Sequence, residues 1–193
     1  VFSDLTDSNG QALDQNTFVF EIGAFDPTFV PDSSNTSQWA SNWRVFDRAA
    51  YSQANGYFTS TTHIMNDGTS NSPFETPSVP SFAGLEAYLW VRNGDNPVPG
   101  TEWLLTRASA WVFPVPDPTE DCCDKGVIEW SVSDIVAEVP KWGKQGTIGG
   151  PGVFTDSNPH TLQTYTFVPE PSSALLAALA GVFAVTRRRR NHA

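Results

Sequence analysis

The chain has 193 residues, which is enough for one globular domain and a short appendage but not for two full domains. Hydrophobic residues make up 39% and charged residues 17%, and the 14 Gly, 15 Pro and 7 Trp favour a turn-rich β protein over a helical bundle or a disordered chain. Four of the 11 basic residues lie at 187–190, so the body before them carries seven basic against 21 acidic side chains, a net charge of −14. That charge repels phosphate and therefore disfavours nucleic-acid binding, while divalent cations and neutral sugars remain suitable ligands.

Alternating hydrophobicity is the main structural signal in the body. Residues 17–23 place Phe18, Phe20 and Ile22 on one face, and residues 85–91 place Leu85, Ala87, Leu89 and Val91 on one face. A period of two is typical of a β-strand that is buried on one side. The same reasoning predicts further strands over 57–64, 103–113, 127–132 and 161–167.

Residues 35–51 show a different spacing. Trp39, Trp43 and Phe46 recur at i, i+4 and i+7, which predicts one amphipathic helix with its indoles against the sheet. Residues 66–81, rich in Ser, Asn and Pro, predict a long loop. The expected fold class is therefore mainly β, a β-sandwich or jelly roll that carries one helix.

Two aromatic residues lie on the more polar face of the strand over 85–91. Tyr88 and Trp90, flanked by Glu86 and Arg92, could stack on sugar rings as exposed aromatics do in carbohydrate-binding modules. The alternative is that this face meets the helix or a second sheet, where Trp is buried by packing alone. We favour core packing and keep glycan stacking as the second interpretation.

Candidate catalytic groups are sparse. None of the three His residues lies in a recognisable triad motif, and Glu86, Glu102 and Glu129 fall on three separate predicted strands. Such glutamates pair as acid and base only if a concave sheet face brings them together. We expect no enzymatic activity, with a glycosidase as the weaker alternative.

Cys122 and Cys123 are adjacent, so a bond between them would close a strained ring and could not join distant segments. Three states stay open: a vicinal disulfide that stiffens a loop, two thiols, or bridges to other chains. We rank the vicinal disulfide first, because exposed thiols oxidise outside the cytoplasm.

An acidic loop surrounds the cysteines. Its carboxylates are suitable oxygen ligands for Ca²⁺. We favour the alternative that this loop is solvated and binds no ion, so no cofactor is expected. The candidate ligands are Asp117, Glu120, Asp121 and Asp124.

The composition changes abruptly after residue 167. Val168-Pro169-Glu170-Pro171 is followed by an apolar segment, 172–186, and by Arg187, Arg188, Arg189 and Arg190 in the basic end 187–193. As a helix the 15 residues of this segment would reach about 22 Å, against about 30 Å for a bilayer core, which predicts a short transmembrane helix. Arginines next to a span stay cytoplasmic, so the ectodomain, 1–167, is expected on the outer side of the inner membrane.

This order of parts resembles the PEP-CTERM sorting signal of Gram-negative bacteria. Val168 to Pro171 match the motif, 174–186 the helix and Arg187 to Arg190 the basic cluster. The resemblance implies exosortase as partner, a transient inner-membrane precursor and delivery to the envelope or extracellular matrix with exopolysaccharide. No Met or apolar leader precedes Val1, and because the tail at the other end implies export, we expect that a secretory signal has been removed. The alternatives for the ectodomain are a carbohydrate-binding module and a self-associating subunit of a surface layer or filament.

Overall fold

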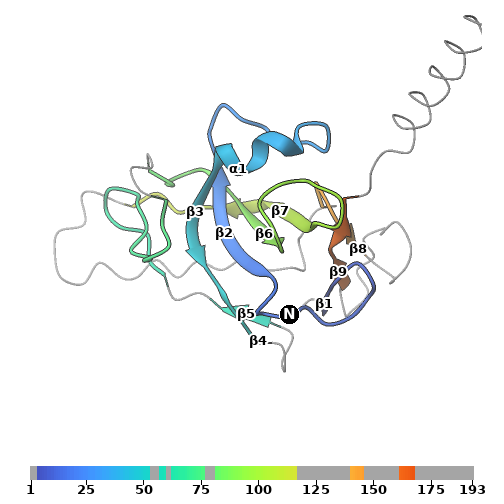
Figure 1. The fold of residues 1–193 in the computed structure, drawn as a ribbon. Helices are drawn as coiled ribbons and strands as arrows, with labels where there is room; N and C mark the ends of the chain where they lie inside the picture. Colours follow the sequence, from blue (N-terminus) through green and yellow to red (C-terminus); the bar gives the residue numbers. More distant parts are fainter. Residues whose placement is uncertain are drawn as a thin grey trace, which may run out of the picture.

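A computed structural model of the chain describes residues 4–52, 57–59, 62–76, 81–116, 140–145 and 161–167 (Figure 1). This part is mainly β with one short helix, which confirms the class predicted from composition. The elements in chain order are β1 (Asp4–Thr6), β2 (Val19–Phe25), η1 (Thr36–Gln38), α1 (Trp39–Asn42), β3 (Trp43–Arg48), β4 (Ala50–Ser52), β5 (Tyr57–Thr59), β6 (Glu86–Arg92), β7 (Glu102–Val112), β8 (Lys144–Gln145), β9 (Thr161–Gln163) and β10 (Tyr165–Thr166).

A five-stranded antiparallel sheet with the order β10-β7-β6-β2-β3 forms the centre of the fold. Strands β6 and β7 are neighbours in the chain and in the sheet, joined by the turn at residues 93–101. β2 pairs with β6 on one side and β3 on the other. The alternation predicted for β2 and β6 is therefore confirmed, with boundaries shifted by one or two residues.

Both faces of this sheet are buried. The larger core, on the face of Phe20, Ile22, Leu89 and Val91, is mostly aliphatic and Phe. The opposite face carries a second cluster, which we call the tryptophan core. The tryptophan core consists of Phe25, Trp39, Trp43, Tyr88, Trp90, Trp103 and Leu105. Since adjacent strand residues point to opposite faces, two apolar faces explain why β2 and β6 are buried along almost their whole length.

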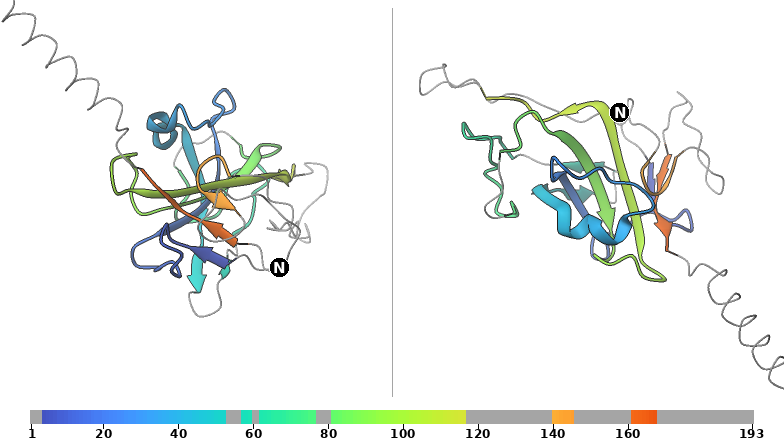
Figure 2. Two further views of the ribbon diagram at one scale, coloured as in Figure 1. Left: turned by 90° about the vertical axis from the view of Figure 1, so that its right-hand side faces the viewer. Right: turned by 90° about the horizontal axis from the view of Figure 1, so that it is seen from above.

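The prediction of one helix over 35–51 is wrong beyond Asn42. η1 and α1 span residues 36–42, and the chain then continues as strand β3. Trp43 enters the tryptophan core and Phe46 the larger core, because two residues three apart in a strand point to opposite faces. The helix-like spacing therefore came from two side chains that point to opposite faces. Figure 2 shows the segment 36–42 lying across the face of the sheet that carries the tryptophan core.

A second, three-stranded sheet with the order β1-β9-β8 adjoins the edge of the first (Figures 1 and 2). β1 runs parallel to β9, and Leu5 and Leu162 pack into the larger core. Only Thr164 separates β9 from β10, so the chain passes from one sheet to the other at this point. The finer prediction of a sandwich or jelly roll stays a prediction, because residues 117–139 and 146–160 lie outside the described part.

Three further predictions concern two strands and the loop between residues 66 and 81. The strand over 57–64 is shorter than predicted, since β5 ends at Thr59 and pairs with β4. The loop prediction for 66–81 agrees with the described residues in that range, which contain turns and one isolated bridge, Ile64 with Ser70. The strand predicted over 127–132 lies outside the described residues.

Candidate functional site

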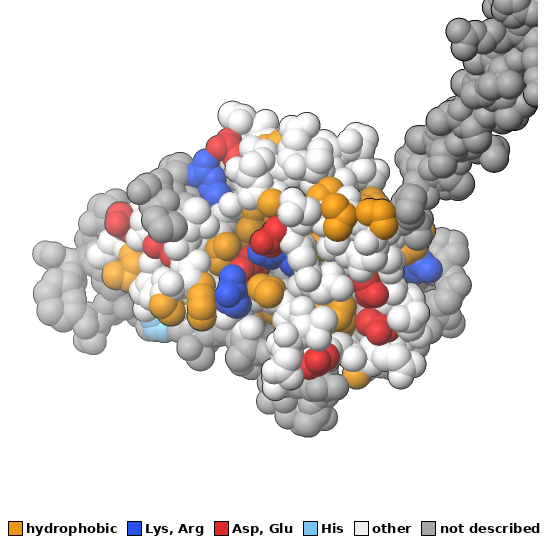
Figure 3. Space-filling model, in the orientation of Figure 1, with side chains coloured by type: hydrophobic (Ala, Val, Ile, Leu, Met, Phe, Trp, Pro, Cys, Tyr) orange, Lys and Arg blue, Asp and Glu red, His pale blue; other side chains and the backbone are white. Residues whose placement is uncertain are grey.

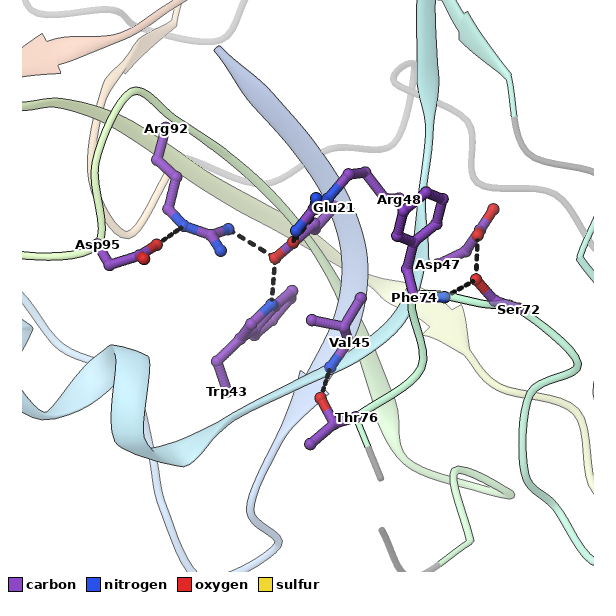
Figure 4. Close-up of polar contacts among 10 residues, drawn as sticks. All are labelled: Glu21, Trp43, Val45, Asp47, Arg48, Ser72, Phe74, Thr76, Arg92 and Asp95. Carbon is purple, nitrogen blue, oxygen red and sulfur yellow. Dashed lines mark hydrogen bonds and ion pairs between the residues drawn. The ribbon is translucent and has the colours of Figure 1, made fainter. Parts of the chain in front are cut away.

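A buried carboxylate, Glu21, lies next to Trp43 of the tryptophan core (Figure 4). Its Oε2 accepts hydrogen bonds from Trp43 Nε1 at 2.9 Å and from Arg92 Nη1 at 2.7 Å. Its Oε1 accepts from Arg48 Nη2 at 2.8 Å and from Arg48 Nε at 3.2 Å. Four donors occupy the roughly four acceptor positions of the carboxylate, so Glu21 has no free lone pair to act as a general base.

The two arginines of this cluster differ in exposure. The Arg92 side chain is 10% exposed, lies over the Trp90 ring at 4.2 Å and also pairs with Asp95 at the surface. The Arg48 side chain is 45% exposed and lies over the ring of Phe74 at 5.0 Å. Figure 3 shows acidic and basic side chains next to one another at the centre of this side of the molecule, with separate apolar patches around them. The cluster is therefore charge-balanced and holds β2, β3 and β6 together.

Tyr88 and Trp90, the candidate sugar-stacking residues, are 5% and 0% exposed. Their rings contact Phe25, and Trp90 also meets Trp43 and Trp103 edge to face. Neither ring presents a face to a ligand, which agrees with the core-packing interpretation and corrects the stacking alternative for these two residues. The physical reason is that η1, α1 and β3 cover this side of the sheet.

Glu86 and Glu102 are not brought together. In the register of the sheet, Arg92 at the end of β6 lies opposite Trp103 of β7, so Glu102 lies just beyond that end, whereas Glu86 begins β6. Six residues at about 3.3 Å each separate the two ends of β6 by about 20 Å, well beyond the spacing of a glycosidase carboxylate pair. Glu129, the third candidate, lies outside the described residues.

Each of these two glutamates has its own local partners. Burial acts to raise the pKa of Glu86, but hydrogen bonds from Arg107 and Tyr88 outweigh it and hold that pKa below its ordinary value. Glu102 accepts from the Ser8 hydroxyl at 2.8 Å and from the Thr164 hydroxyl at 2.6 Å. Glu102 thereby joins the turn after β1 to the residue between β9 and β10.

The cysteines Cys122 and Cys123 and the acidic candidates Asp117, Glu120, Asp121 and Asp124 lie outside the described residues. Within the described ranges, no group of three His, Cys, Asp or Glu side chains is placed to hold a metal ion. The same ranges contain no helix with the length and apolarity that crossing a bilayer requires, and the predicted span at 172–186 falls beyond them.

The described chain ends at Phe167, which is tied to the central sheet. Its N–H donates to the Thr101 carbonyl at 2.8 Å, and its carbonyl accepts from Gly100 N–H at 3.0 Å. Its ring stacks on Trp142 with centroids 4.0 Å apart and planes 14° from parallel, and meets Trp103 edge to face at 4.8 Å. We call these five residues, Gly100, Thr101, Trp103, Trp142 and Phe167, the C-terminal clamp.

Trp142 holds its place in the clamp through the edge of β7. Leu105 N–H donates to the Trp142 carbonyl at 2.9 Å, and the indole Nε1 donates to the Tyr165 carbonyl of β10 at 2.9 Å. The next residue, Gly143, has φ +114°, and a Cβ there would lie 2.6 Å from Leu104 Cδ1. Only glycine fits that conformation and that space, so the Trp-Gly pair fixes the ring against β10.

The family comparison connects this junction to the tail. A family model described as the PEP-CTERM protein-sorting motif matches residues 167–190. The chain carries a PEP-CTERM sorting motif. The match confirms the resemblance of Val168 to Pro171 and of Arg187 to Arg190, and it supports an exosortase-sorted surface protein with a membrane-anchored precursor. No curated protein and no solved structure matches the chain.

The PEP-CTERM motif begins at Phe167, the residue that closes the clamp. The body therefore reaches the sorting signal without an intervening linker. Sequence reasoning missed Trp142 and Glu21, the residues that organise the junction and the tryptophan core. The available signals were a lone Trp-Gly pair and a single Glu within the apolar run of β2, and neither has a periodicity that reveals its partner.

Proposed function

We propose that this chain is the precursor of an exported cell-surface or extracellular-matrix protein that exosortase sorts and trims, with a non-enzymatic ectodomain. The observation that carries the proposal is the sorting motif at 167–190, which follows β10 directly. The apolar segment 172–186 and Arg187 to Arg190 would hold the precursor in the inner membrane with the ectodomain outside.

The test compares the full chain in two hosts that differ only in a working exosortase. We expect the mass of the envelope-associated protein to fall below the 21.1 kDa of the full chain only in the host that has the enzyme. Replacing both motif prolines, Pro169→Ala with Pro171→Ala, should keep the protein at full mass in the membrane fraction. The matched control Asp95→Asn changes one exposed carboxylate that is distant in sequence from the sorting motif, and this variant should be processed normally. Full mass of the wild-type protein in both hosts contradicts the proposal.

The proposed extracellular partner is exopolysaccharide. The net charge of −14 on the chain before Arg187 repels acidic polymers, so association requires a neutral polysaccharide or bridging divalent cations. Retardation of the processed protein on gels that contain neutral glycans, or acidic glycans with Ca²⁺, would support this partner. Equal mobility on all of these gels and on a glycan-free gel would remove it.

Self-association through the exposed edge of the central sheet is less favoured. At edge strand β3 the Val45 N–H donates to Thr76 Oγ1 at 2.9 Å, and the Val45 carbonyl accepts from Thr76 N–H at 3.2 Å. The groups that a second copy would use at Val45 are therefore already paired within the chain. We accordingly place sorting and surface retention ahead of strand-mediated assembly.

A further inference from the structure

We infer that the C-terminal clamp sets the limit of exosortase trimming, so that the scissile bond lies on the carboxyl side of Val168 or later and the processed protein keeps Phe167. This inference rests on the proposed function and adds a position for the cut. It follows from the hydrogen bonds and ring contacts of Tyr165, Phe167 and Trp142.

Two of the carbonyl groups just before Val168, those of Tyr165 and Phe167, are already engaged. A peptidase must bind its substrate as an extended strand and take the carbonyl oxygen of the scissile bond into an oxyanion hole. The Tyr165 carbonyl accepts from the Trp142 indole, and the Phe167 carbonyl accepts from Gly100 N–H. Cleavage after either residue would first have to remove these donors. The first peptide carbonyl beyond the clamp is that of Val168.

Strand pairing protects the same segment along its length. Tyr165 pairs with Trp103 and Thr166 with Glu102 at the edge of the central sheet, so β10 has no free edge toward β7. Phe167 N–H also donates to Thr101. Each hydrogen bond favours the paired state of this segment over its detached state roughly fivefold. The two bonds of Phe167 and the indole bond of Trp142 together therefore favour the paired state roughly a hundredfold.

The rings add a second barrier. Phe167 lies between Trp142, which stacks on it, and Trp103, which is fully buried. A peptidase pocket that received the Phe167 side chain would have to extract it from both contacts. The clamp therefore places the boundary between retained body and removable signal no earlier than Val168, the second residue of the matched motif.

Chymotrypsin tests the clamp without exosortase. This protease cuts after aromatic residues that fit its hydrophobic pocket, and Tyr165 and Phe167 are the last two aromatic residues before the motif tetrapeptide. In the folded full chain in non-ionic detergent we expect cleavage after both to be at least tenfold slower than in the urea-unfolded chain. Equal rates would show that the segment is open and would overturn the inference.

Variants of Trp142 separate the two contributions of its side chain. Trp142→Ala removes the stack and the indole donor and should raise the cleavage rate after Tyr165 and Phe167 about tenfold or more. Trp142→Phe keeps a ring but loses the donor and should lie between. Phe74→Ala, which truncates a half-exposed aromatic outside the clamp, should leave the rate unchanged. Circular dichroism must show that each variant is folded, and a folded Trp142→Ala with the wild-type rate contradicts the role of the clamp.

Intact mass of the processed protein from the exosortase-containing host locates the cut itself. We expect a carboxyl terminus at Val168 or later. A terminus at Phe167 or earlier in the wild-type protein overturns the inference while leaving sorting intact. A chain that is not trimmed at all overturns the proposed function, and the assigned position falls with it. The chymotrypsin result would then remain as a property of the body alone.

Discussion

Arg92 of β6 donates to the buried carboxylate of Glu21 on β2, with Nη1 and Oε2 2.7 Å apart. The two side chains project from neighbouring strands into the tryptophan core, where Glu21 is fully buried. A buried charge is tolerated only when it is paired and hydrogen-bonded, so the core depends on Arg92, Arg48 and Trp43 together.

Removing the charge of Glu21 should destabilise the protein strongly. Glu21→Gln keeps the size of the side chain and an acceptor for Trp43, but it leaves the guanidinium of Arg92 without its buried partner. We expect the free energy of unfolding, measured by urea denaturation of the full chain in detergent, to fall by about 3 kcal/mol.

The matched control removes the other partner of the same arginine. Asp95 is 70% exposed, so Asp95→Asn should lower the free energy of unfolding by less than about 1 kcal/mol. Similar losses for the two variants would mean that Glu21 is solvated in solution, which would contradict the buried cluster.

A second prediction concerns the place where β2 passes under the Trp43 indole. A Cβ built on Gly23 would lie 2.1 Å from the Arg44 carbonyl oxygen and 2.7 Å from Trp43 Cζ2. Gly23→Ala should therefore separate β2 from β3 and lower the free energy of unfolding by about 2 to 3 kcal/mol in thermal or urea melts. At Gly94 the nearest atom to such a Cβ is Thr101 Cγ2 at 3.5 Å, an ordinary contact. Gly94→Ala should be neutral or slightly stabilising, and a neutral Gly23→Ala would refute the close approach.

The sequence predicted the central strands well where one period held throughout. In β6 the alternating set Ala87, Leu89 and Val91 enters the larger core as expected. The prediction failed at β3, because Trp39 belongs to α1 while Trp43 and Phe46 lie on opposite faces of β3, and burial on both faces imitates a helical spacing. Hydrophobic periodicity records which residues are buried, but it does not record which face of the sheet each of them occupies.

The candidate sites also divide into those that the sequence predicted and those that it did not. The sorting motif could be recognised because its parts are local and follow one another along the chain. Glu21 and Trp142 were not, since their partners lie on strands distant in sequence: Arg92 is 71 residues from Glu21, and Tyr165 is 23 residues from Trp142. Buried ion pairs and ring stacks between distant segments need a register, and a single sequence does not supply one.

The acidic side chains of the turns predict how stability depends on pH. Asp14, Asp32 and Asp67 each accept hydrogen bonds from the residue two positions later, which lowers the pKa of each carboxyl group. The pKa of Asp26 is lowered to about 2, first by the Thr28 N–H, then by the Thr28 hydroxyl and by Arg44. Such a group protonates more easily in the unfolded chain, so its contribution is present above about pH 4 and is lost as pH falls toward 2.

We therefore expect the melting temperature to fall as pH is lowered from about 4 to 2. Because the isoelectric point of the chain is about 4.5, the chain is already net positive in this range and further protonation adds repulsion, so the comparison between variants is more diagnostic than the slope alone. Asp26→Asn should flatten the fall, and Thr28→Ala, which removes only the hydroxyl donor, should flatten it less. If the melting temperature of Asp26→Asn fell with pH as steeply as that of the wild type, the lowered pKa of Asp26 would be contradicted.

At alkaline pH, Tyr88 should ionise only well above pH 10. Burial raises its pKa to about 12, and its hydroxyl donates to Glu86 Oε2 at 2.9 Å, a bond that the phenolate would lose. A raised folded-state pKa means that this contribution to stability is complete below about pH 10 and disappears as pH rises toward 12. In an ultraviolet titration of the four tyrosines, the late step should vanish in Tyr88→Phe and move to lower pH in Glu86→Gln, which keeps the burial but removes the charge. Ionisation of all four tyrosines together near pH 10, with the circular dichroism of the folded state unchanged, would show that Tyr88 is not buried beside Glu86.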